Sequence, residues 1–105
     1  MDSAGSKVNA AGARLGEDGQ VRLASGVAVG LRMWRSEKPG APKAASTRAY
    51  ETVGFVLEGR AELDIDGSKM LLEPGDSWTV PRGASHSYRI LETFSALEAT
   101  APPAP

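Results

Sequence analysis

The most informative stretch of the sequence is GDSWTVPRGASH, residues Gly75–His86. The preceding Glu73 and Pro74 complete a turn, in which proline presets one backbone angle and the following glycine permits the next. Residues 77–80 then predict a short strand, which a proline and a glycine close before a histidine opens the next predicted strand. The stretch therefore predicts two antiparallel strands with a histidine near their junction.

Short apolar runs separated by turn residues continue on both sides of this stretch, from Val21 to Ala99. This spacing favours a sandwich or barrel over a helical fold. The predicted strands cover residues 26–35, 47–58, 61–66, 69–72, 77–80, 85–91 and 93–99, with a loop at 36–46. The tail from Thr100 to Pro105 contains three prolines, and we expect it to stay outside a central sheet.

The predicted strand 47–58 has two faces of different size, because alternate residues of a strand point to opposite sides. The bulky face carries Val53, Phe55 and Leu57, and the small face carries Thr52, Gly54 and Val56. Space beside Gly54 is available to a ligand, or to one of the side chains of Met33, Trp34 and Trp78.

The chain of 105 residues has room for one hydrophobic core, without cysteine and with a formal charge of −1. We expect a flexible segment at 1–19, one domain at 20–100 and a proline-rich tail at 101–105. No apolar run is long enough to span a bilayer, and neither charge sign forms a block. These features predict a soluble, cytoplasmic protein without a nucleic-acid or membrane partner.

The stretch Gly75–His86 resembles the second cupin motif: glycine, five residues, proline, any residue, glycine, two residues and histidine. The motif's closing asparagine would fall at Ile90, which is a departure from the pattern. The sequence VLEG, residues 56–59, looks like the end of the first motif. The resemblance covers about 26–99 and implies an all-β, double-sheet jelly-roll barrel that holds a ligand inside. It also implies a homodimer formed through strands at a sheet edge.

Metal-binding cupins supply two histidines and a glutamate or third histidine from the first motif. Those positions correspond here to Ser46, Arg48 and Thr52, or to Ala45 and Thr47 for the histidines if the spacing is longer. His86 alone remains, so the resemblance implies that the metal site is largely dismantled and that no cofactor is tightly held. A weak divalent-metal site of His86 and Glu51 would need a β-bulge to turn that glutamate inward.

Five residues are candidates for a site inside the barrel: His86, Tyr88, Tyr50, Arg48 and Thr52. His86 and Tyr88 share a strand face, a pair suited to proton transfer. An inward Arg48 would bind carboxylate or phosphate through two parallel bonds. The structural alternatives are a histidine satisfied by one carbonyl or hydroxyl, a tyrosine that fills the barrel and an arginine at an exposed strand end.

Three functions remain open at this level. The first is a module that binds a small polar or anionic molecule without a metal. The second is an enzyme, either a metal-free isomerase or epimerase with His86 as base and a tyrosine as acid, or a weakly metal-dependent one using Glu51. The epimerase needs a carboxylate to orient the histidine, for which Glu92 and Glu98 are the candidates. The third is a structural domain whose aromatic residues fill the barrel.

Overall fold

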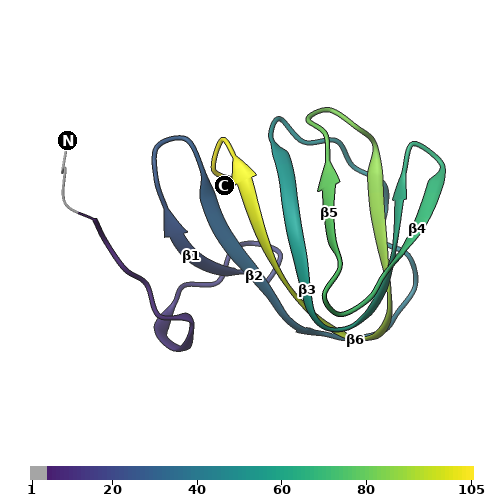
Figure 1. Ribbon diagram of the computed structural model, residues 1–105, viewed down its shortest axis with the longest axis horizontal. Coiled ribbons are helices and arrows are strands. Elements are labelled where there is room, and N and C mark those ends of the chain that lie inside the picture. Colours follow the sequence, from purple (N-terminus) through teal and green to yellow (C-terminus); the bar gives the residue numbers. More distant parts are fainter. Residues whose placement is uncertain (1–4) are drawn as a thin grey trace.

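The computed structural model describes residues 5–105, and its regular secondary structure is almost entirely β (Figure 1). Its strands are β1 (Val21–Ser25), β2 (Gly30–Glu37), β3 (Glu51–Ile65), β4 (Ser68–Leu72), β5 (Ser77–Val80) and β6 (His86–Ala101). One short 3-10 turn, Ala10–Gly12, precedes them. Within residues 5–105, no helix is long and apolar enough to cross a membrane. The predicted all-β class is confirmed.

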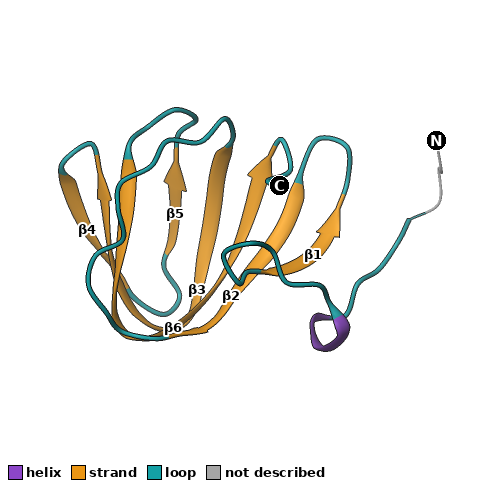
Figure 2. Cartoon of the chain, turned by 180° about the vertical axis from the view of Figure 1, so that it is seen from behind, coloured by secondary structure: helices purple, strands orange, loops and turns teal. Residues whose placement is uncertain are grey.

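The two longest strands, β3 and β6, pair along their whole lengths, from Glu51 opposite Ala101 to Ile65 opposite His86. The strand order is β1-β2-β6-β3-β4, and β5 pairs with the first part of β3. The pairing of β3 with β6 shifts register between Val56 and Ala61, and such irregularities bend strands. The sheet therefore curls round from β1 to β4 into a barrel, which Figures 1 and 2 show from opposite sides.

The structure corrects several predicted strand boundaries. The predicted strands 47–58 and 61–66 form one bent strand, β3, and those at 85–91 and 93–99 form β6. The first predicted strand begins at Gly30 rather than 26, and β1 precedes it as a separate strand. Thr100 and Ala101 pair within the sheet, so the prediction for the start of the tail was wrong.

The faces of β3 are oriented so that the small side chains point into the barrel. Val56 is buried in the core with Leu63, Leu72 and Phe94. The ring of Trp78 occupies the space at Gly54, where an added Cβ would collide with it. The bulky residues face outward, with exposed fractions of 50% for Val53, 46% for Phe55 and 45% for Leu57.

The N-terminal segment folds onto β1. Residues 1–4 of the segment that we expected to be flexible lie outside the described residues. Leu15 pairs with Val21, and the amide of Arg22 donates to the carbonyl of Arg14. The turn between Leu15 and Val21 is therefore attached to the barrel at the end where the cavity lies.

Candidate functional site: a polar cavity inside the barrel

The barrel contains a cavity of about 660 Å³ that is partly open to solvent, and its volume is within the range of small-molecule sites. Its walls come from β2, the loop between β2 and β3, β3, β5 and β6, and from the turn before β1. Aromatic side chains line this space without filling it. The hypothesis of a structural domain required aromatic side chains to fill the barrel, and this cavity contradicts that requirement.

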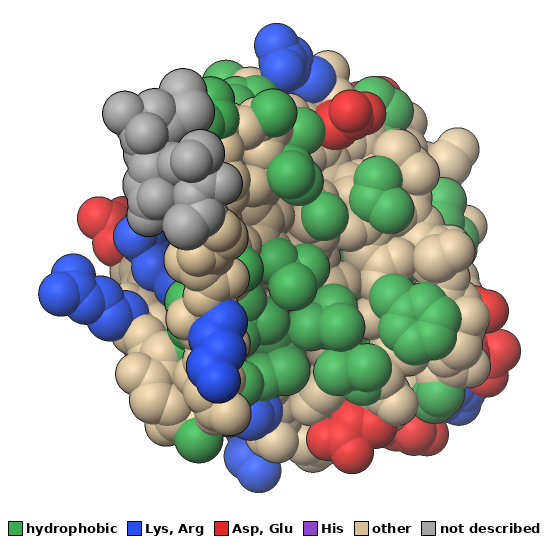
Figure 3. Space-filling model, turned by 60° about the vertical axis from the view of Figure 1, so that its left-hand side comes forward, with side chains coloured by type: hydrophobic (Ala, Val, Ile, Leu, Met, Phe, Trp, Pro, Cys, Tyr) green, Lys and Arg blue, Asp and Glu red, His purple; other side chains and the backbone are tan. Residues whose placement is uncertain are grey.

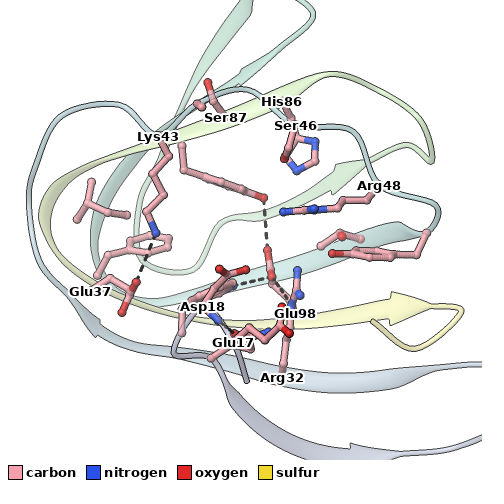
Figure 4. Close-up of a pocket in the computed structure, with 18 of the residues that line it drawn as sticks. Glu17, Asp18, Arg32, Glu37, Lys43, Ser46, Arg48, His86, Ser87 and Glu98 are labelled. Carbon is pink, nitrogen blue, oxygen red and sulfur yellow. Dashed lines mark hydrogen bonds and ion pairs between the residues drawn. The ribbon is translucent and has the colours of Figure 1, made fainter. Parts of the chain in front are cut away.

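The five candidate site residues all line this one cavity. They are Arg48, Tyr50, Thr52, His86 and Tyr88. Three of them belong to β3 or to the loop that leads into it, and two belong to the start of β6. Thr52 is buried, whereas Arg48 is exposed at the rim and extends its guanidinium into the cavity (Figure 4).

A buried carboxylate, Glu98 of β6, organises one side of the cavity and is 2% exposed. Its Oε1 accepts hydrogen bonds from Arg32 Nε at 2.9 Å and Trp34 Nε1 at 2.7 Å. Its Oε2 accepts from the hydroxyl of Tyr88 at 3.3 Å. These contacts satisfy the charge of Glu98 and fix the side chains around it.

The Tyr88 phenol is held as a hydrogen-bond donor. Its hydroxyl accepts from Trp78 Nε1 at 3.2 Å and donates to Glu98. Burial raises the pKa of Tyr88, and the nearby Glu98 carboxylate raises it further. Tyr88 therefore keeps its proton at neutral pH, and its hydroxyl is a weak acid.

Arg32 pairs with Glu98 and also contacts two aromatic rings. Its guanidinium carbon lies 5.4 Å from the ring centroid of Trp34 and 5.5 Å from that of Tyr50. Burial alone would lower the pKa of Arg32, but the contributions of Glu98 and Tyr50 outweigh it and raise the pKa. Arg32 is therefore a permanently charged part of the wall.

His86 is oriented by the backbone. Its Nδ1 lies 3.0 Å from the carbonyl oxygen of Ala84, and a carbonyl only accepts, so Nδ1 carries the hydrogen. In the neutral ring, Nε2 is then the acceptor left for a ligand. Neither predicted carboxylate contacts His86: Glu98 bonds to Tyr88, and Glu92 pairs with Arg60 at 3.6 Å.

The donor set does not fit a transition metal. The positions that the cupin resemblance assigns to metal ligands carry a hydroxyl at Ser46, a cation at Arg48 and a hydroxyl at Thr52. With the longer spacing, Ala45 and Thr47 take the places of Ser46 and Arg48, and neither is a good transition-metal ligand. The register is regular from Glu51 to Val56, so no bulge turns Glu51 inward, and this residue does not line the cavity. In the described part of the chain, no three histidine, aspartate or glutamate side chains converge as a metal group would require.

Sequence reasoning missed several residues of the cavity, which are Glu17, Asp18, Gln20, Arg32, Glu37 and Lys43. Arg32 was hidden because β2 alternates Arg32 and Trp34 with the apolar Leu31 and Met33, and apolar residues usually mark the inward face. Here the inward face of β2 lines a polar cavity, so its polar residues point inward and its apolar residues point outward. Glu17 and Asp18 lie in a segment whose sequence has no hydrophobic periodicity.

The sequence is similar to a known protein family and to one characterised enzyme. A family model described as "Cupin domain" matches residues 34–99. Over 36 residues the chain is 47% identical to quercetin 2,3-dioxygenase of Bacillus subtilis, a match that covers 34% of this chain and 11% of that enzyme.

Solved structures extend the likeness to the whole barrel. An RmlC-like cupin of Shewanella frigidimarina is similar with a TM-score of 0.81 and 19% identity, covering 97% of this chain and 95% of the other. The structure of KdgF from Halomonas sp. is similar with a TM-score of 0.72 and 20% identity, covering 79% and 76%. At these identities the likeness concerns the fold, and it confirms the predicted jelly-roll class.

Proposed function

Because the chain belongs to the cupin domain family, we propose that its barrel binds a small anionic molecule, with Arg48 as the charged anchor and no tightly held metal. One observation carries the proposal. Of the three Lys and Arg side chains that line the cavity, Arg32 pairs with Glu98 at 2.9 Å and Lys43 pairs with Glu37 at 3.6 Å. Among residues 5–105, no carboxylate lies within 4.0 Å of Arg48 to form an ion pair, which leaves its charge available.

The position of Arg48 supports this role. With the shorter of the two spacings, Arg48 occupies a position that the cupin resemblance assigns to a histidine ligand. A positively charged side chain then stands where a metal ligand would be. A guanidinium binds carboxylate or phosphate through two parallel hydrogen bonds, without needing a metal. Figure 4 shows its side chain reaching into the cavity near His86.

His86 adds a second polar contact. With Nδ1 donating to Ala84, the free Nε2 can accept a hydrogen bond from a ligand hydroxyl or amine. The ring also lies edge-on to Tyr88, at a centroid distance of 5.9 Å. The ligand that suits this wall has an anionic group for Arg48 and a hydrogen-bond donor for His86.

The same contacts favour binding over acid-base catalysis. An epimerase pair requires an oriented histidine base and a tyrosine that gives up its proton. Here the tyrosine proton is committed to Glu98, and the raised pKa of Tyr88 makes its transfer to a substrate unfavourable. The enzyme alternative therefore needs Tyr50 rather than Tyr88 as its acid.

Replacing Arg48 with glutamine tests the proposal. Butyrate and inorganic phosphate are titrated into the protein while amide chemical shifts are followed by NMR. We expect the dissociation constants to rise at least about tenfold in Arg48→Gln, because a charged hydrogen-bond pair is lost. His86→Ala should weaken binding less, and circular dichroism should show that both variants stay folded.

Arg82 provides the matched control, since it is an exposed arginine that does not line the cavity. Arg82→Gln should bind both anions as the parent protein does. Elemental analysis of the same untagged samples measures metal content. Binding unchanged in Arg48→Gln, or near-stoichiometric metal that His86→Ala loses, would refute the proposal.

We further propose that the chain forms a homodimer through the outer face of β2, β6 and β3. Two rows of neighbouring residues make this face apolar: Leu31, Ala99 and Val53, then Met33, Leu97 and Phe55. These six central positions carry no charge, and Figure 3 shows hydrophobic side chains gathered on one side of the molecule. A second copy presents the same uncharged rows, so the face is complementary to itself.

A charge placed on this face should separate the subunits. We expect light scattering after gel filtration to give the dimer mass for the parent protein and the monomer mass for Phe55→Glu. The control is Val27→Glu in the turn between β1 and β2, where the side chain is 84% exposed. A parent protein that is monomeric at all accessible concentrations, or a dimer that survives Phe55→Glu, would contradict the assignment.

A further inference from the structure

The charges of the cavity fall into two separate groups once the ion pairs are removed. The ionisable lining residues are Glu17, Asp18, Arg32, Glu37, Lys43, Arg48, Tyr50, His86, Tyr88 and Glu98. Arg32 pairs with Glu98 at 2.9 Å, and Lys43 pairs with Glu37 at 3.6 Å. Within residues 5–105, neither Glu17 nor Asp18, in the turn before β1, has a cationic partner within 4.0 Å. The remaining charge is thus cationic at Arg48 and anionic at Glu17 and Asp18.

Hydrogen bonds hold the acidic turn, residues 16–20, in a defined conformation at the rim of the cavity. The amide of Gly16 donates to the carbonyl of Gln20 at 2.7 Å, and the amide of Gly19 donates to the carbonyl of Gly16 at 3.0 Å. The side chain of Gln20, which is 4% exposed, accepts from the amide of Asp18 at 3.0 Å. These bonds hold the backbone of Glu17 and Asp18 at the cavity mouth.

The two groups reach the cavity from different parts of the chain. Arg48 comes from the loop before β3, and Figure 4 shows Glu17 and Asp18 on the other side of Glu98 from it. The acidic turn precedes residue 34, where the match to the family model begins. It therefore lies outside the part of the chain that the family model describes.

We infer that the ligand is a small zwitterion, an amino acid or a related amine-bearing carboxylate. Its anionic group contacts Arg48, and its ammonium group faces Glu17 and Asp18. Glu17 and Asp18 are exposed at the cavity mouth, where they repel a ligand with negative charge alone and attract an ammonium group. A zwitterion satisfies both sides of the cavity at once. This inference rests on the proposed function, the binding of an anionic group at Arg48, and specifies which chemical class of ligand carries that group.

Matched pairs of small probes test the inference. Glycine, β-alanine and 4-aminobutyrate vary the spacing between the charges, and acetate, propionate and butyrate are the same acids without the amine. Each probe is titrated into the full chain while amide shifts are followed by NMR. We expect at least one amino acid to bind about tenfold more tightly than its matching acid, as one added charged hydrogen bond predicts.

A double variant, Glu17→Gln with Asp18→Asn, separates the acidic turn from the rest of the site. It should abolish the preference for the amino acid and leave binding of the plain acid equal or stronger. Glu51→Gln on the outside of β3 is the control and should keep the preference.

The outcomes distinguish the two proposals. If the plain acids bind as tightly as the amino acids and Arg48→Gln weakens both, the inference is overturned and the anion site stands. If no probe shifts any amide, or if Arg48→Gln has no effect on those that bind, both proposals are overturned. A preference for the amino acid that persists in the double variant would overturn the role of the acidic turn.

Discussion

Glu98→Ala is expected to lower the free energy of unfolding by about 3–5 kcal/mol, the cost of leaving a buried ion without its partner. The Arg32 side chain is 15% exposed, so water reaches it poorly once the carboxylate is removed. Trp34 Nε1 and the Tyr88 hydroxyl would lose their acceptor in the same change. Urea unfolding followed by tryptophan fluorescence measures the loss.

Glu92→Ala is the matched control, because this glutamate lies on the same strand and also pairs with an arginine. Its side chain is 58% exposed, and the contact with Arg60 is 3.6 Å long. Exposed pairs contribute about 0–1 kcal/mol, so this variant should unfold near the parent's midpoint. A loss at Glu98 no larger than that at Glu92 would contradict the role given to the buried carboxylate.

The barrel was predictable because the two glycines and the proline of the stretch Gly75–His86 constrain the backbone at fixed positions. Gly75 and Gly83 have positive φ angles of 90° and 80°, which glycine adopts without strain. Such positions can be recognised from residue type and spacing alone. The same reasoning placed His86 at the start of β6 and on the cavity wall.

The polar network around Glu98 could not be derived in the same way. Tyr88 and Glu98 lie on one strand, ten positions apart, and a straight strand would separate them by about 33 Å. The bend in β6 brings their oxygens to 3.3 Å across the cavity. Alternation indicates that both residues share a face, but only the bend decides that the carboxylate meets Tyr88 rather than His86.

In this barrel polar side chains face the cavity and apolar side chains face outward, the reverse of an ordinary core. This arrangement made the inner and outer faces of the strands hard to assign from the sequence. In a barrel with a polar cavity, Arg32 of β2 and Glu98 of β6 point inward. The apolar Leu31 of β2 and Phe55 of β3 remain outside. Hydrophobic alternation alone cannot distinguish this arrangement from an ordinary core. The exposed fraction of Phe55, 46%, is what separates the two.

Gly59→Ala is expected to be the most damaging substitution by a small residue, because the bend of the barrel depends on this glycine. Gly59 has a φ of 80°, and an added Cβ would collide with the backbone carbonyl of Thr93 on the paired strand β6. Backbone atoms of a paired strand cannot move aside as a flexible side chain can. We expect a loss of about 4 kcal/mol or more, or failure to fold, measured by soluble yield and thermal unfolding.

Gly67→Ala isolates the contribution of backbone angle from that of the collision. Gly67 has a similar φ of 88° in the turn between β3 and β4, but an added Cβ there would meet no atom within 4 Å. This variant should lose only about 1–2 kcal/mol, the cost of a left-handed conformation for a non-glycine residue. Equal losses at the two positions would mean that the contact with Thr93 adds nothing and that the bend does not depend on the close approach of β3 and β6.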